Sequence, residues 1–177
     1  QRTDGHITDP QGGRSMNAKG PVFKYGDNID TDVIIPARYL NTQSPAELAA
    51  HCMEDIDKDF IHNVKDGDIM VGGWNFGCGS SREQAPEIIK ALGISCVIAK
   101  SFARIFFRNS INNGLLLIEQ PDLHDDIKEG DTITVKMNEH VDLQRKTYPI
   151  AALPENLMDI IQAGGLVKAM RKRNGLD

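Results

Sequence analysis

The stretch that decides the fold is Gly72-Gly-Trp-Asn-Phe-Gly-Cys-Gly-Ser-Ser-Arg-Glu-Gln-Ala-Pro86. It follows a short apolar run, Ile69 to Val71, and precedes a helical pattern that continues to about Leu92. Its four glycines let the backbone adopt positive φ and approach a ligand closely. Exposed amides at the start of the coming helix favour an anion. The stretch therefore predicts a loop that can hold a carboxylate or a phosphate.

Ser80 and Ser81 in this loop admit two interpretations. Ser80-x-x-Glu83 and Ser81-x-x-Gln84 both match the capping box, in which a hydroxyl only closes a helix end. Pro86 favours the other interpretation, because proline is tolerated in the first helical turn and the helix can then begin after the serines. At least one hydroxyl would then be free.

Arg82 stands beside the two hydroxyls. A guanidinium forms bidentate pairs with carboxylates and the hydroxyls can donate further bonds, so the three side chains suit a carboxylate ligand. A solvated surface arginine is the ordinary alternative. The nucleophile elbow G-x-S-x-G is absent, so Ser80 needs a route to activation other than a serine-hydrolase triad.

Outward from this loop, short apolar runs alternate with helical ones. The pattern predicts a strand at Ser95 to Ala99, a helix at Phe102 to Asn112 and a strand at Leu115 to Ile118. Such alternation is typical of βαβ units and a parallel sheet. The pattern then changes, because Thr132 to Met137 and Asp142 to Ile150 alternate apolar and polar residues and predict antiparallel strands. We expect an α/β fold with a partly parallel sheet flanked by helices.

The two ends of the chain carry weaker signals. A strand is predicted at Val22 to Tyr25, and a helix at Pro45 to Met53 with Ser44 as its N-cap. A last helix should begin near Pro154 and end at Gly164-Gly165. Residues 1–15 are polar and rich in Gly and Asp, so we expect an expression leader without fixed structure, followed by one domain over residues 16–177.

Composition limits the classes of function. The 177 residues include 20 basic and 25 acidic ones, and the net charge of −5 argues against nucleic acid as the partner. Apolar runs are strand-sized, far below the ~20 residues of a membrane span, so we expect no membrane association. Cys52, Cys78 and Cys96 are too few and too widely spaced for a disulfide framework or an iron-sulfur ligand set. A reducing cytoplasm is the natural location.

Three ordered runs together carry a family resemblance. They are YGDNIDTDVIIPARYL from Tyr25, NFGCGSSREQAPEIIKALG from Asn75 and KSFARIFFRNSINNGLLLIE from Lys100. They resemble the small subunits of aconitase-superfamily isomerases that act on isopropylmalate, and the likeness extends from Val22 to about Lys168. The resemblance implies a swivelling β/β/α domain equivalent to the fourth domain of aconitase, encoded as its own polypeptide. It also implies a large-subunit partner that holds a [4Fe-4S] cluster, while this chain binds no metal or other cofactor.

The resemblance assigns roles to the loop residues. Ser80 matches the serine that removes a proton from a carbon next to a carboxylate, and Arg82 matches the arginine that binds a substrate carboxylate. Gly79 and Ser81 match positions that contact the substrate. A serine alkoxide needs aimed backbone amides and positive charge, which the glycine loop and Arg82 can supply. The partner's open iron would act as a Lewis acid on the substrate hydroxyl, so neither subunit would be active alone.

Substrate choice in this family depends partly on the loop Tyr39-Leu40-Asn41-Thr42. Homoaconitases tend to have arginine where this chain has Asn41. A neutral Asn41 favours a small 2-hydroxy dicarboxylic acid with an alkyl group, such as isopropylmalate in leucine biosynthesis. The alternatives are the small subunit of a 2,3-dimethylmalate dehydratase or of a homoaconitase, or an anion-binding module without catalysis.

Two further groups have plainer interpretations. Asp27, Asp30 and Asp32 lack the glycine of a calcium-binding EF-hand loop, so turn formation and loop anchoring are favoured over a cation site. Cys78 could act as a nucleophile with His51 or His62 as base, but neither histidine lies in a recognisable catalytic signature, and a small buried cysteine is the more ordinary interpretation.

Overall fold

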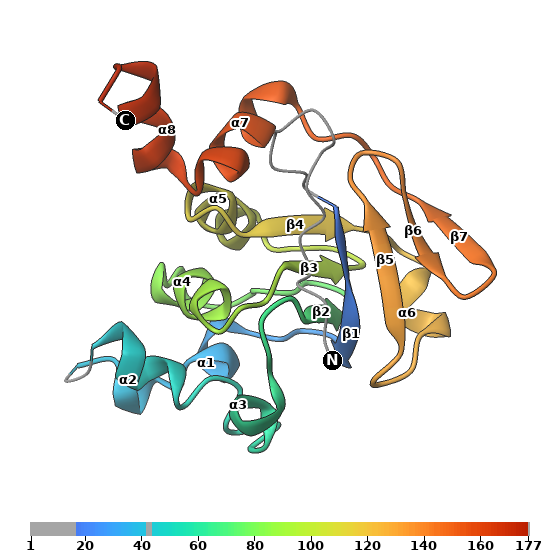
Figure 1. Cartoon of the computed structure of the whole chain (residues 1–177). Coiled ribbons are helices and arrows are strands. Elements are labelled where there is room, and N and C mark those ends of the chain that lie inside the picture. The colour runs from blue at the N-terminus through green and yellow to red at the C-terminus, as the bar shows by residue number, and fades with distance from the viewer. Residues whose placement is uncertain (1–16, 42–43, 177) are drawn as a thin grey trace.

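The computed structural model describes residues 17–41 and 44–176. Its centre is a seven-stranded sheet with the strand order β4-β3-β2-β1-β5-β6-β7 (Figure 1). Strands β1 to β4 are mutually parallel, and β5, β6 and β7 continue the sheet in antiparallel fashion. The strands are β1 (Ala18–Lys24), β2 (Ile69–Gly72), β3 (Cys96–Ala99), β4 (Leu116–Glu119), β5 (Thr132–Lys136), β6 (His140–Leu143) and β7 (Lys146–Pro149). The expected α/β class with a partly parallel sheet is confirmed.

Strand β1 joins the two halves of the sheet. Its first part, Ala18 to Pro21, pairs antiparallel with β5, and its second part, Val22 to Lys24, pairs parallel with β2. The sequence predicted a strand only from Val22. The first four residues, Ala-Lys-Gly-Pro, have little strand propensity of their own, and their extension depends on pairing with a segment more than a hundred residues away.

Helices lie around the sheet. They are α1 (Thr31–Ile34), the 3₁₀ turn η1 (Ala37–Tyr39), α2 (Pro45–Ala49), α3 (Phe60–Asn63), α4 (Gln84–Ala91), α5 (Arg104–Asn112), α6 (Leu123–Asp126), α7 (Glu155–Ala163) and α8 (Leu166–Arg173). Figure 1 shows α1 to α4 together on one side of the parallel strands, α5 beside β4, and α6 near β5 to β7.

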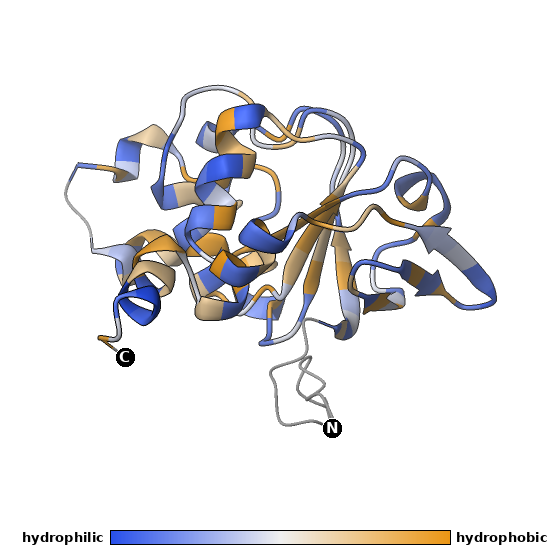
Figure 2. Ribbon diagram, turned by 90° about the horizontal axis from the view of Figure 1, so that it is seen from above, coloured by the Kyte–Doolittle hydropathy of each residue, from blue (hydrophilic) through white to orange (hydrophobic). Residues whose placement is uncertain are grey.

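The two faces of the parallel strands build two separate apolar cores. Side chains alternate along β2, so that Met70 joins the cluster beneath α1 to α4, while Ile69 and Val71 join the opposite cluster with β5 to β7. This alternation is expected of strands buried on both faces. The strands are accordingly the most continuously apolar elements in Figure 2. None of the described helices is long and apolar enough to cross a membrane.

Local signals placed several helix ends correctly. Ser44 accepts a bond from the Glu47 amide and forms a full capping box, with Pro45 at the first position. Gly164 ends α7 in the left-handed conformation, with φ of 92°. The helix from Pro45 stops at Ala49, however, and not at Met53, whose amide donates to the Ile34 carbonyl in a turn with φ of 62°.

Two other differences concern the C-terminal part of the chain. The segment Asp142 to Ile150 is divided between β6 and β7 by a tight turn at Gln144, where φ is 53°. Helix α8 follows directly after Gly165, although the two glycines predicted only a stop. Gly165 can both end one helix and begin the next, because its φ of 133° is open only to glycine. The proposed leader, residues 1–15, lies outside the described residues.

Candidate active site

Three loops meet at the carboxyl ends of neighbouring parallel strands, where ligands bind in open α/β sheets. They follow β1, β2 and β3, and backbone hydrogen bonds join them. The Gly77 amide donates to the Ile29 carbonyl at 2.7 Å, and the Thr31 amide donates to the Cys78 carbonyl at 2.9 Å. The Ala103 amide donates to the Phe76 carbonyl at 3.0 Å. The glycine loop after β2 is thus fixed on both sides.

Two glycines of this loop are required by its geometry. Gly77 has φ of 83°, and a Cβ added there would lie 2.1 Å from the Phe106 ring. Gly79 has φ of 87°, and its added Cβ would lie 3.2 Å from the Asp30 carboxyl carbon. Left-handed backbone is strained for other residues, so the loop can take this path only with glycine at both positions.

The serines do not cap helix α4. The helix begins at Gln84, its N-cap is Glu83, and no side chain caps it. The capping-box interpretation of Ser80 and Ser81 is therefore wrong, and the interpretation based on Pro86, which occupies the third helical position, is right. Both serines are exposed, and neither hydroxyl bonds to a described group.

The backbone around Ser80 is held, while its amides remain available. Thr31 Oγ1 donates to the Ser80 carbonyl at 2.5 Å. Within residues 17–41 and 44–176, no group accepts a hydrogen bond from the amides of residues 79–82. Consecutive unpaired amides in a turn form a favourable environment for an anion. The anion-binding loop expected from the sequence has the donors that this role needs.

Arg82 is anchored from the loop after β1. Its Nη1 donates to Asp32 Oδ1 at 2.9 Å and to the Ile35 carbonyl at 3.1 Å, and its side chain is 19% exposed. The Arg82 guanidinium, followed by the Ala37 amide at 2.8 Å, holds the pKa of the Asp32 carboxyl below its usual value. The other Arg82 nitrogens bond to no described group, so they remain available for a ligand carboxylate.

The other aspartates of this loop also anchor backbone. Asp27 accepts a bond from the Trp74 amide at 2.8 Å, and Asp30 caps α1 by accepting from the Asp32 amide at 2.5 Å. The interpretation of Asp27, Asp30 and Asp32 as turn-forming and anchoring residues is confirmed. Among the described residues, no cluster of three His, Cys, Asp or Glu side chains could hold a metal ion.

A cavity of about 310 Å³ opens beside Ser81 and Arg82. Its lining comes from α1, the glycine loop and the first two turns of α5. The residues are Thr31, Gly77, Gly79, Ser81, Arg82, Ala103, Arg104, Ile105, Phe106 and Asn109. Three of the site residues predicted from the sequence, Gly79, Ser81 and Arg82, lie here, whereas the sequence analysis did not place α5 at the site. Ser80 stands between two lining residues without being one itself.

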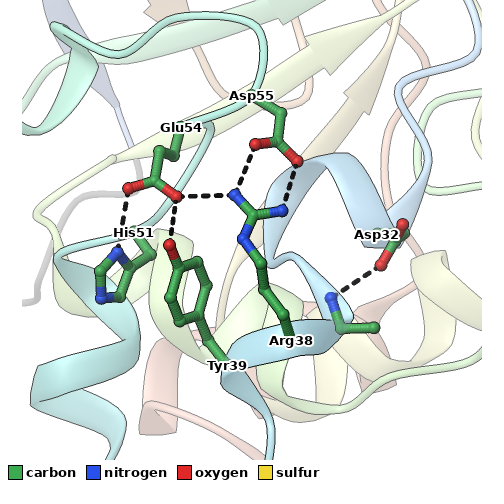
Figure 3. A network of polar contacts seen from close by, with 7 residues as sticks. Asp32, Arg38, Tyr39, His51, Glu54 and Asp55 are labelled. Carbon is green, nitrogen blue, oxygen red and sulfur yellow. Dashed lines mark hydrogen bonds and ion pairs between the residues drawn. The ribbon is translucent and has the colours of Figure 1, made fainter.

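The described residues of the expected specificity loop do not line this cavity, since Tyr39, Leu40 and Asn41 are not among its lining residues. The Tyr39 hydroxyl donates to Glu54 at 2.8 Å, and its ring stacks on His51 with 3.7 Å between centroids (Figure 3). Leu40 packs on the core, whereas Asn41 is exposed. Thr42 lies outside the described residues.

Arg38 fastens this loop to the turn after α2. Its guanidinium forms a bidentate pair with Asp55, at 2.6 and 3.1 Å, and reaches Glu54 at 2.9 Å (Figure 3). Hydrogen bonds from Arg38 hold the pKa of the Asp55 carboxyl below its usual value. The same side chain lies 4.7 Å from the centre of the Tyr39 ring. These contacts fix the direction in which the chain enters Asn41.

The cysteines do not fit a cluster. Cys52 and Cys96 are fully buried, in separate cores, and burial raises the pKa of the Cys52 thiol far above its usual value and that of Cys96 to about 12. Cys78 is partly exposed in the glycine loop, and burial followed by the Asp30 carboxylate raises its pKa as well. Thiols held in the protonated form are poor metal ligands and poor nucleophiles.

Known proteins are similar to this chain in sequence and in fold. Residues 22–123 match the model of the aconitase C-terminal domain. The 3-isopropylmalate dehydratase small subunit of Lachnospira eligens is 61% identical over 92% of this chain and 100% of its own length, and that of Halothermothrix orenii is 58% identical over 88% and 96%. The crystal structure of a 3-isopropylmalate dehydratase from Methanocaldococcus jannaschii superimposes with a TM-score of 0.85 at 48% identity, over 90% of this chain and 96% of that one.

Proposed function

Because this chain belongs to the aconitase C-terminal domain family, and within it to the small subunits of 3-isopropylmalate dehydratase, we propose that Ser80 and Arg82 are its contribution to a shared active site. The assembled enzyme is a hydro-lyase that interconverts 2-isopropylmalate and 3-isopropylmalate by dehydration and rehydration in leucine biosynthesis. The small subunit works with a separate large subunit.

The observation that carries the proposal is the presence of an exposed, unbonded Ser80 hydroxyl and a hydrogen-bonded Arg82 on one loop. Ser80 takes the proton from the carbon next to a substrate carboxylate. Arg82 holds that carboxylate with the nitrogens that Asp32 leaves unused, and Gly79 and Ser81 contact it from the loop. The amides of residues 79–82 stabilise negative charge on the serine oxygen and on the substrate.

No step of the proton transfer needs a metal from this chain. The described residues do not fit an iron-sulfur cluster, so we assign the [4Fe-4S] cluster to the large subunit. Ser80 has no described histidine or carboxylate partner that could act as its base, which is a reason for the chain to depend on that subunit for turnover. Three free thiols suit a reducing compartment, and we place the enzyme in the cytoplasm.

Asn41 supports isopropylmalate over a tricarboxylate. It is exposed at the end of the loop that Arg38 and Tyr39 fix, and it offers no charge for an additional carboxylate. We infer that Tyr39 and Leu40 act by positioning Asn41, since their own side chains are engaged in the protein.

Ser80→Ala tests the proposal in the enzyme reconstituted with a cluster-containing large subunit. We expect kcat to fall by about 10³-fold or more, because the proton acceptor is lost, while KM changes little. Ser95→Ala is the matched control, because its hydroxyl makes two long bonds, both of 3.3 Å, to carbonyls remote from the site. A fully active Ser80→Ala enzyme would leave only an anion-binding role for the loop.

A further inference from the structure

The cavity beside Arg82 is cationic, although the chain as a whole carries a net charge of −5. Two arginines, Arg82 and Arg104, are among its lining residues, and none of the described residues that line it carries a carboxylate. A cavity lined by one sign of charge concentrates ligands of the other sign. Its volume of about 310 Å³ is at the lower end of the range for small-molecule sites.

The position of Arg104 in this cavity is electrostatically unfavourable for a cation. It is the first residue of α5, a nine-residue helix with no acidic side chain in its first turn and no side chain capping its N-terminus. A cation there faces the positive end of the helix dipole. The Arg104 side chain is exposed and makes no hydrogen bond or ion pair with any group in the described part of the chain. A bound anion would offset the unfavourable helix dipole and would give the Arg104 guanidinium a partner.

Unlike Arg104, both Arg38 and Arg82 have carboxylate partners within the chain. Arg38 contacts two carboxylates, and Arg82 gives one nitrogen to Asp32 and to the Ile35 carbonyl. Arg82 therefore retains only part of its guanidinium for ligands, which is enough for one carboxylate. A dicarboxylic substrate brings two.

We propose that Arg104 binds the second carboxylate of the substrate, in the cavity that it shares with Arg82. The inference rests on the proposed function, because it takes its ligand from the dicarboxylic substrate named there. Ala103, Ile105 and Phe106 add apolar side chains to the same lining. They give the carbon chain of that substrate an apolar surface.

A carboxylate side chain of the large subunit is the other possible source of this chemistry, because Arg104 and Ile105 also line a second cavity of about 660 Å³. Arg108 lies one turn further along α5, is exposed like Arg104, and lines this second cavity but not the first. Arg108 is thus the matched control that separates a substrate contact from a general effect of charge on α5.

The test compares Arg104→Gln, Arg104→Lys and Arg108→Gln, each assembled with the large subunit at saturating concentration. We expect Arg104→Gln to raise KM for isopropylmalate by about 10- to 100-fold with kcat changed less than about threefold. Arg104→Lys should restore part of the loss, because it restores the charge without the planar fork. Arg108→Gln should leave KM unchanged.

Inhibition by two simple acids makes the assignment specific. Arg104→Gln should weaken inhibition by malate, a dicarboxylate, about tenfold and leave inhibition by 2-hydroxy-3-methylbutyrate, a monocarboxylate, unchanged. Circular dichroism of the isolated variant checks that it is folded. If KM and malate inhibition are unchanged, or if only the affinity for the large subunit falls, Arg104 does not bind substrate. Neither result affects Ser80, whose substitution tests the function itself.

Discussion

The Arg82 guanidinium donates a 2.9 Å hydrogen bond to the carboxylate of Asp32, which lies 50 residues earlier in the chain. This pair links the loop after β1 to the loop after β2, and the same Asp32 oxygen accepts the Ala37 amide at the start of η1. One carboxylate therefore connects the proposed substrate arginine to the segment that leads into Asn41.

Asp32→Asn should uncouple these two segments. The amide cannot provide the charge that orients Arg82, so we expect KM of the assembled enzyme for isopropylmalate to rise about tenfold. Steady-state kinetics measures this rise. Asp126→Asn is the control, because it removes an ion pair with Lys146 that lies beside the antiparallel part of the sheet, away from the site. Equal effects of the two substitutions would contradict a specific link between Asp32 and the site.

The Asp32 contribution should also depend on pH. Its carboxyl pKa is lowered from 3.8 in the folded chain, so its stabilising effect is fully present above that value and is lost as the pH falls through the lower, folded value. The difference in urea midpoint between the isolated wild type and Asp32→Asn should therefore be constant from about pH 5 to pH 8 and shrink toward pH 3. A difference in urea midpoint that grew as the pH fell would contradict this prediction.

Gly77→Ala should lower the free energy of unfolding by more than the backbone strain alone, because the new methyl group would also clash with Phe106. We expect a loss of about 2–4 kcal/mol in the free energy of unfolding, of which about 1 kcal/mol comes from the left-handed φ and the rest from the clash with Phe106. Gly130→Ala separates the two causes. Gly130 has a similar φ of 86° with open space around it, so only the first cost should appear in urea unfolding.

Arg38→Gln should loosen the loop before Asn41 while leaving the rest of the fold intact. Both carboxylate contacts of Arg38 would be lost, so hydrogen exchange of the amides of residues 38–41 should become about tenfold faster. Tyr39→Phe keeps the stacking on His51 and loses only the bond to Glu54, so it should give a smaller change. Uniformly faster exchange throughout the sheet would indicate global destabilisation instead.

The cysteines should differ in reactivity. In the native chain at pH 8, iodoacetamide should modify Cys78 slowly, because its thiol is accessible but its pKa is raised. Cys52 and Cys96 should react only after unfolding, since both are fully buried. Peptide mass spectrometry with and without urea checks the order. Rapid labelling of Cys78 would revive its consideration as a nucleophile.

Asn41→Arg tests the specificity loop. The new cation should lower activity toward isopropylmalate and improve the relative kcat/KM for a substrate with an additional carboxylate, by about tenfold in the ratio. A substrate panel with the assembled enzyme measures this ratio. If the ratio is unchanged, Asn41 does not contact the variable part of the substrate, and the α5 side of the cavity becomes the better candidate.

Helix starts and ends that depend on residues within one turn of the chain could be predicted from the sequence. Ser44 with Pro45 gave a helix start, and Gly164 gave a helix end. Pro86 was decisive at the site, because it placed the helix start after the serines. In each case the residue restricts its own backbone or bonds to a neighbour three positions away.

Contacts between residues far apart in the sequence could not be predicted in the same way. The Arg82–Asp32 pair and the approach of α5 to the glycine loop depend on how β1, β2 and β3 are ordered in the sheet. Arg104 did carry a local signal, since a cation in the first turn of a helix opposes the dipole. That signal becomes informative only once the start of α5 is known to be Arg104 and not Phe102.

The divided pairing of β1 has a consequence for biosynthesis. Ala18 to Pro21 can find their partners only after Thr132 to Val135 have left the ribosome, although they are made far earlier. Until then the nascent chain carries a strand with one unpaired edge, which is a site for wrong pairing with other chains. Truncations that end before Thr132 should therefore aggregate during translation.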